Sequence, residues 1–221
     1  MLDSRDYTLI IDKKEMRAPL SVRRAPPYPL SDKSGSMSIK DQPGGKSRWQ
    51  AMQESTLAIA SKCEEFDPDG ITIYTFSGRF KRYDNVTANK VMQIFRENEP
   101  SGRTDLAGVL QDALSDYLRR KAAGQTQPNG ETLLVVTDGE PDDRKAVMRV
   151  IVETSRQIDR DEELGISFIQ VGDDVDATKF LKILDDDLQS AGAKFDIVDT
   201  VTMDEMEDMT LTEVLLNALI D

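Results

Sequence analysis

The sequence contains no histidine and only one cysteine, Cys63. Without histidine, the chain cannot use histidine-based acid–base catalysis, a Ser-His-Asp triad or histidine-ligated zinc. A single cysteine cannot form a disulfide within the chain, and the helical pattern around Cys63 indicates a small, packed side chain. Several common classes of enzyme and metalloprotein are therefore excluded.

Long apolar runs and an excess of positive charge are also missing. No stretch approaches the roughly 20 apolar residues of a membrane-spanning helix, and residues 1–6 lack the apolar core of a signal peptide. The formal net charge is −13, whereas surfaces that bind nucleic acid or anionic membranes need clustered lysine and arginine. We therefore expect a cytoplasmic protein that binds neither nucleic acid nor membranes and has an acidic, solvated surface.

Short apolar segments alternate with amphipathic ones along the 221 residues, which suffice for one domain with a substantial core. We expect strands at 7–11, 71–76, 80–86, 131–137, 166–171 and 195–198. We expect helices at 47–66, 87–98, 104–118, 142–163, 178–190 and 211–220. This alternation predicts an α/β fold in which helices flank a doubly wound, mainly parallel sheet, with residues 80–86 as a short antiparallel edge strand.

Residues 13–31 interrupt the alternation. They hold four of the nine prolines and are net basic in an acidic protein, so we expect an extended, polyproline-like or disordered segment. The dipeptide Asp-Lys stands on both sides, at 12–13 and again at 32–33. Without residues 13–32 the first strand would run directly into a Ser-Gly-Ser loop, and we therefore interpret the segment as an insertion in a single domain, residues 1–221.

The insertion has two interpretations. It is either an inert natural or engineered insert, or a specificity loop that contacts a partner through Arg23, Arg24 and Tyr28.

Three polar stretches fall where expected strands end or helices begin. Asp32, Ser34 and Ser36 form an Asp-x-Ser-x-Ser pattern in a glycine-containing loop, Thr104 precedes a helix that it can cap, and Asp138 follows the most apolar strand. In doubly wound sheets, ligands bind beyond the carboxyl ends of the strands, where the strand order reverses. Closely spaced hard oxygen ligands suit a hard divalent cation such as Mg²⁺.

These three motifs, in this order and context, resemble a von Willebrand factor type A domain with a metal-ion-dependent adhesion site, of the stand-alone intracellular bacterial type. The resemblance covers nearly the whole chain apart from residues 13–31. It implies a site for Mg²⁺, or for Mn²⁺ or Ca²⁺, and a non-enzymatic role in which an acidic side chain of a protein partner completes the metal shell. In that family the matching residues hold the metal directly or through water, and here they are Asp32, Ser34, Ser36, Thr104 and Asp138. Intracellular members often act as adaptors or partners of ATPases.

The first aspartate of the site has two candidates. In the family a strand leads directly into this aspartate, whereas here Asp12 follows the strand and Asp32 precedes the two serines. Either Asp12 is the ligand and the serines return after a looped-out excursion, or Asp32 is the ligand with a relaxed connection to the strand. We prefer Asp32 at this point because it keeps the five-residue loop intact.

Other readings of these residues exist. Ser34, Ser36 and Thr104 are also typical turn and cap residues, and Asp138 is also a typical turn former. An alternative function is a Mg²⁺-dependent phosphotransferase or hydrolase with Asp12 or Asp32 as nucleophile. Against it, the chain lacks a phosphate-cradling Gly-x-x-x-x-Gly-Lys-Ser/Thr loop and a convincing lysine with a second acid.

Overall fold

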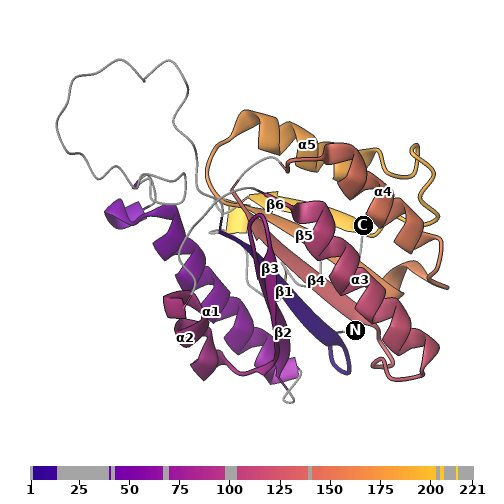
Figure 1. Cartoon of the computed structure of the whole chain (residues 1–221), viewed down its shortest axis with the longest axis horizontal. Helices are drawn as coiled ribbons and strands as arrows, with labels where there is room; N and C mark the ends of the chain where they lie inside the picture. Colours follow the sequence, from indigo (N-terminus) through magenta and orange to yellow (C-terminus); the bar gives the residue numbers. More distant parts are fainter. Residues whose placement is uncertain are drawn as a thin grey trace.

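The structure, a computed structural model, describes residues 2–13, 40, 43–66, 70–97, 104–138, 141–202, 205–206 and 213. Within these ranges the chain forms a six-stranded sheet with helices on both faces (Figure 1). The strands are β1 (Asp6–Asp12), β2 (Ile71–Phe76), β3 (Phe80–Val86), β4 (Glu131–Thr137), β5 (Leu164–Gln170) and β6 (Val198–Thr202). The helices are α1 (Arg48–Phe66), α2 (Ala88–Glu97), α3 (Leu106–Ala122), α4 (Arg144–Ser155) and α5 (Val175–Asp186), with short 3-10 turns η3 (Pro43–Gly45) and η4 (Asp161–Glu163).

The strand order is β3-β2-β1-β4-β5-β6. Every neighbouring pair is parallel except β2 and β3, which are antiparallel. The chain moves outward from β1 through β2 to β3, crosses to β4 on the other side of β1, and continues outward to β6. The winding therefore reverses between β1 and β4, and the predicted doubly wound sheet with an antiparallel edge strand is confirmed.

The middle of the central strands is mostly apolar because both faces of the sheet are covered. Helices α1 and α2 pack on one face, and α3, α4 and α5 pack on the other (Figure 1). Every residue of β4 and β5 is buried, whereas five of the seven residues of the edge strand β3 are exposed. Burial on two faces explains why the central strands lack a polar alternation.

Three predicted helices begin or end at other residues than expected, and the one expected at 104–118 runs from Leu106 to Ala122. The helix expected at 142–163 ends at Ser155, whose hydroxyl donates to the carbonyl of Val152 at 2.8 Å and so competes with the helical backbone bonds. The helix expected from residue 178 begins at Val175. Its N-cap is Asp174, whose carboxylate accepts hydrogen bonds from two backbone N–H groups of the first turn.

The last strand also differs from the prediction at 195–198, since β6 begins only at Val198. The Ile197 carbonyl accepts a hydrogen bond from the Ile166 N–H at 2.7 Å, and the ladder with β5 runs from there to Thr202. Phe195 lies in the loop before β6 and packs against the core. Its apolar side chain therefore resembled the start of a strand in the sequence. The helix expected at 211–220 lies outside the described residues apart from 213. No helix within the described ranges combines the length and apolarity needed to cross a membrane.

Candidate metal site at the carboxyl edge of the sheet

Two of the predicted ligands lie side by side where β1 and β4 end. Asp12 is the last residue of β1 and is fully buried, and Asp138 directly follows β4 and is 3% exposed. The Thr137 hydroxyl at the end of β4 donates to Oδ2 of Asp12 at 2.8 Å. Because the strand order reverses between these two strands, the carboxylates occupy the edge where doubly wound sheets bind ligands.

Thr104 joins this edge through the backbone. Its carbonyl accepts a hydrogen bond from the N–H of Asp142, four residues after Asp138, at 3.0 Å. On the other side, the N–H of Asp105 donates to the carbonyl of Ser77, which directly follows β2, at 2.9 Å. The segment before α3 therefore crosses the carboxyl ends of the strands, as the sequence predicts.

The prediction that Thr104 caps α3 is wrong. The N-cap is Asp105, whose Oδ1 accepts a hydrogen bond from the Gly108 N–H at 2.9 Å. Thr104 is only 1% exposed, and its hydroxyl has no hydrogen-bond partner among the described residues. A buried hydroxyl without a partner costs about 1–3 kcal/mol, so this oxygen fits a ligand position for a metal better than a structural role.

The other three predicted ligands belong to the Asp-x-Ser-x-Ser pattern. Asp32, Ser34 and Ser36 lie outside the described residues. Within the described ranges, no group of three or more acidic, histidine or cysteine side chains is positioned to hold a metal. The described part of the edge instead offers two carboxylates, Asp12 and Asp138, and the Thr104 hydroxyl, which is a set of hard oxygen donors of the kind that Mg²⁺ and Mn²⁺ prefer.

Of the two acidic residues at 142 and 143, Asp143 has a structural role. Asp143 is the N-cap of α4, and its Oδ1 accepts a hydrogen bond from the Ala146 N–H at 2.9 Å. Asp143 therefore belongs to the start of α4, where a negative charge is favourable.

A family model described as the von Willebrand factor type A domain matches residues 30–140, which is half of the chain. This chain belongs to the von Willebrand factor type A family. The matched range includes Asp32, Ser34, Ser36, Thr104 and Asp138, and it leaves out β1 with Asp12. Domains of this family commonly mediate protein–protein interactions and bind metal.

Solved structures show the same fold. Proximal thread matrix protein 1 from the mussel byssus is 15% identical with a TM-score of 0.58, and the match covers 98% of this chain and 48% of that one. The manganese-loaded TRAP protein of Plasmodium vivax is 13% identical with a TM-score of 0.57, covering 98% and 74%. A mutant of the PilB minor pilin from Streptococcus sanguinis is 13% identical with a TM-score of 0.57, covering 96% and 60%. The chain thus spans about half of the mussel protein, and at these identities the likeness shows the fold alone. No curated protein matches the chain.

The hairpin between β2 and β3 lies on the same edge of this von Willebrand factor type A domain. Phe80 of β3 is in register with Phe76 of β2, which is in register with Asp12 of β1. The N–H of Lys13 donates to the Phe76 carbonyl at 2.9 Å. Burial, followed by repulsion from Lys81, lowers the pKa of Lys13.

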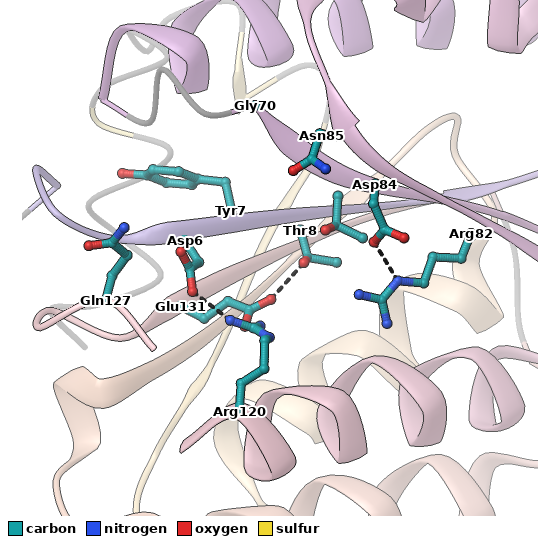
Figure 2. A pocket seen from close by; sticks show the side chains of 11 residues that line it. Asp6, Tyr7, Thr8, Gly70, Arg82, Asp84, Asn85, Arg120, Gln127 and Glu131 are labelled. Carbon is teal, nitrogen blue, oxygen red and sulfur yellow. Dashed lines mark hydrogen bonds and ion pairs between the residues drawn. The ribbon is translucent and has the colours of Figure 1, made fainter. Parts of the chain in front are cut away.

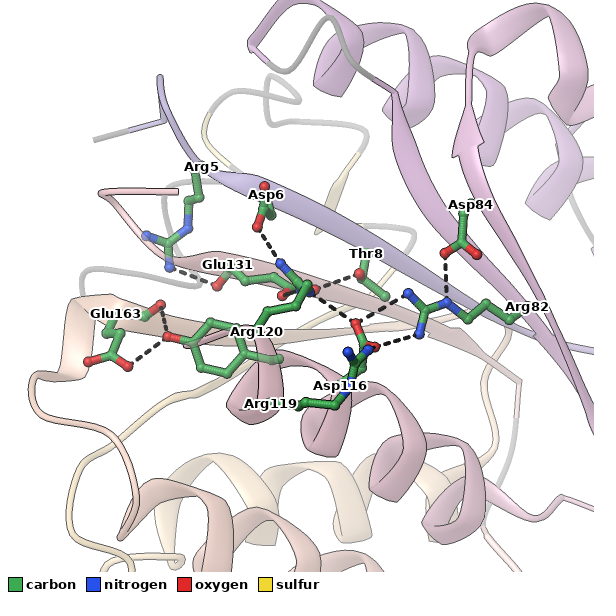
Figure 3. Close-up of polar contacts among 11 residues, drawn as sticks. Arg5, Asp6, Thr8, Arg82, Asp84, Asp116, Arg119, Arg120, Glu131 and Glu163 are labelled. Carbon is green, nitrogen blue, oxygen red and sulfur yellow. Dashed lines mark hydrogen bonds and ion pairs between the residues drawn. The ribbon is translucent and has the colours of Figure 1, made fainter. Parts of the chain in front are cut away.

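A second polar cluster, which the sequence did not predict, lies at the opposite edge of the sheet (Figure 3). Arg120 of α3 bonds to Asp6 at 2.6 Å, to Asp116 at 3.0 Å and to the buried Glu131. The Thr8 hydroxyl donates to Glu131 Oε1 at 2.6 Å. Burial raises the pKa of Glu131, and the charge of Arg120 opposes this rise. The cluster ties α3 to the amino ends of β1 and β4.

A pocket of about 230 Å³ borders this second cluster (Figure 2). Its charged walls are paired with one another, since Arg120 bonds to Asp6 and Arg82 bonds to Asp84 at 2.7 Å. Sequence reasoning missed the cluster because its members come from separate strands and from α3, and no local pattern connects them. The internal pairing indicates a stabilising role.

We expect Asp116→Asn to remove an acid-sensitive part of the stability. Burial alone would raise the pKa of Asp116, but hydrogen bonds from Arg82, Arg120 and Arg119 lower it to about 2. A carboxyl with a lowered folded-state pKa stabilises the fold above its unfolded pKa, and that stability is lost as the pH falls toward 2. Urea denaturation of the wild type and of Asp116→Asn measures the free energy of unfolding of each protein. The difference between the two free energies should therefore become smaller from about pH 5 to about pH 3. A difference in unfolding free energy that stays constant over this pH range would contradict the role given to Asp116.

Proposed function

We propose that this chain is a protein-binding module that depends on a divalent metal and has no catalytic activity of its own. The observation that carries the proposal is the buried Thr104 hydroxyl, which has no hydrogen-bond partner among the described residues. Thr104 lies at the edge of the sheet where Asp12 ends β1 and Asp138 follows β4. Two carboxylates and a hydroxyl at a strand-order reversal fit a hard cation.

The proposed ligands are Asp138 and Thr104 from the described edge, with Ser34 and Ser36 from the motif that lies within the family match. The hydroxyl ligands are neutral, so only the two carboxylates would offset the charge of Mg²⁺ or Mn²⁺, and a carboxylate that binds through water would offset less of it than one that binds directly. When bound, the ion would supply a Lewis-acidic position for a carboxylate of a partner protein. Asp138, Thr104, Ser34 and Ser36 would hold the ion at this edge of the sheet, where a partner's carboxylate could complete its shell.

For the remaining carboxylate we now favour Asp12 over Asp32. Asp12 is fully buried at the end of β1, and its Oδ2 already accepts a hydrogen bond from Thr137, so its orientation is fixed. A carboxylate has lone pairs left for a metal after accepting one hydrogen bond. Under this proposal, Asp12→Ala abolishes metal binding and Asp32→Ala weakens it only through the loop.

The test is thermal unfolding in Mg²⁺ or Mn²⁺ and in EDTA. At a metal concentration of about 100 times Kd, binding stabilises the fold by about 2.7 kcal/mol, which raises the melting temperature by about 5–10 °C for a chain of this size. Ser34→Ala and Ser36→Ala should abolish this rise. A wild-type melting temperature that is the same in metal and in EDTA would sink the proposal. A generic phosphatase assay in Mg²⁺ should stay at background.

A further inference from the structure

The rim beside the proposed metal site is cationic, although the chain carries a net charge of −13. Lys13 follows β1 directly, and Arg79 and Lys81 stand at the turn and start of the β2–β3 hairpin. Arg79 and Lys81 are exposed, and Phe80 between them is 38% exposed. We call Lys13, Arg79, Phe80 and Lys81 the hairpin rim.

The hairpin rim lies a short distance from the carboxylate of Asp12 at the end of β1. Phe80, Phe76 and Asp12 form one row across three neighbouring strands. Neighbouring strands lie about 4.8 Å apart, so Phe80 is about 10 Å from Asp12 along the row. An extended peptide advances about 3.3 Å per residue, and about three residues of a bound segment would therefore connect the metal to the hairpin.

The two exposed cations of the rim are available to a partner. Among the residues that the structure describes, Arg79 and Lys81 form no ion pair, whereas the next cation, Arg82, bonds to Asp84 and Asp116 on the α3 side. Asp105, whose N–H donates to the carbonyl of Ser77 beside the hairpin, uses its own carboxylate to cap α3. The rim charge is therefore not neutralised by ion pairs of Arg79 and Lys81 with described residues.

We propose that the hairpin rim selects a partner segment with two acidic residues about three positions apart. One carboxylate binds the metal, as the proposed function requires, and the second pairs with Arg79 and Lys81. The inference rests on that proposed function, and it adds a sequence requirement for the partner: a lone acidic residue binds more weakly than a pair.

The probe is a fluorescein-labelled peptide, Gly-Ser-Asp-Ser-Gly-Glu-Ser-Gly, compared with the same peptide carrying Gln in place of Glu. Fluorescence anisotropy measures binding to the full chain in Mn²⁺ and in EDTA. The test variant is Arg79→Glu/Lys81→Glu. The matched control is Arg149→Glu/Arg160→Glu, which makes the same change in net charge at exposed positions on α4 and before η4.

In Mn²⁺ we expect the two-acid peptide to bind the wild type more tightly than the one-acid peptide. Reversing two exposed charges should weaken the two-acid peptide about tenfold and the one-acid peptide about twofold or less. Raising the salt from about 0.1 M to about 1 M shortens the screening length from about 10 Å to about 3 Å and should remove most of the preference. The control variant should keep the preference.

Three results would overturn the inference. They are equal weakening by the test and control variants, an unchanged preference in the test variant, and no binding of the two-acid peptide to the metal-loaded wild type at about millimolar concentration. Failure of the proposed function would be recognised separately, because the melting temperature would then not respond to metal and peptide binding would be the same in EDTA. The rim inference alone fails if metal stabilises the protein normally and the test variant still prefers the two-acid peptide.

Discussion

Replacing Thr104 with valine is expected to abolish the rise in melting temperature that Mg²⁺ or Mn²⁺ gives to the wild-type protein. Valine has nearly the same shape as threonine but no oxygen to offer the metal. The Thr104 hydroxyl is buried and has no hydrogen-bond partner in the described part of the chain, so its removal should leave the metal-free protein equally stable or more stable. Thermal unfolding in EDTA and in Mn²⁺, together with calorimetric titration of Mn²⁺, measures both effects.

Thr56→Val is the matched control. Thr56 lies within α1, is also fully buried, and its hydroxyl also lacks a hydrogen-bond partner among the described residues. It is far in the sequence from every proposed ligand, so its variant should bind Mn²⁺ as the wild type does. If Thr104→Val binds Mn²⁺ as tightly as Thr56→Val, Thr104 is not a ligand and the geometry of the proposed site is wrong.

Replacing Arg120 with methionine is expected to destabilise the fold by about 3 kcal/mol or more, because it leaves the charge of buried Glu131 without its main partner. Glu131 is 1% exposed, and Arg120 also holds Asp6 and Asp116. This loss of stability should become smaller as the pH falls, because protonation of Glu131 removes the unpaired charge. Burial already raises the pKa of Glu131 and so favours its protonation. Urea denaturation at about pH 7 and about pH 5 tests both statements.

Arg119→Met is the control for this second prediction. Arg119 is the neighbouring residue and pairs with the same Asp116, but its side chain is 71% exposed, so its loss should cost well under 1 kcal/mol, as is typical of surface ion pairs. The double variant Arg120→Met/Glu131→Gln should recover part of the stability, because it removes the buried charge as well. Equal losses in Arg119→Met and Arg120→Met would show that burial does not govern this cluster.

The sequence was informative wherever a local pattern reflects burial. The run from Leu133 to Val136 predicted a central strand because a strand covered on both faces needs apolar side chains in succession. The short edge strand predicted at 80–86 is confirmed as β3, whose charged residues Lys81 and Arg82 discourage pairing with a further strand. Boundaries were less certain, because cap residues such as Asp174 compete with similar neighbours, and only the hydrogen bonds actually made decide between them.

For the candidate site, the sequence supplied the candidate residues, and the structure changed one assignment. The sequence indicated Thr104 as both a cap and a ligand, and the structure assigns the cap to Asp105. It indicated two possible first aspartates, and the structure fixes only Asp12 at the end of a strand. The choice between neighbouring residues depends on backbone direction at a single turn, which periodicity does not encode.

By itself, the sequence determined the order of strands and helices, the apolar centre of the sheet and the set of oxygen-bearing residues beside it. The tertiary structure decided which of these meet: Asp12 beside Thr137, the β2–β3 hairpin beside Asp12, and Arg120 on Glu131. The physical reason is that periodic burial is a property of each segment. Contacts between segments instead depend on strand order and register, which are set only when the whole sheet assembles.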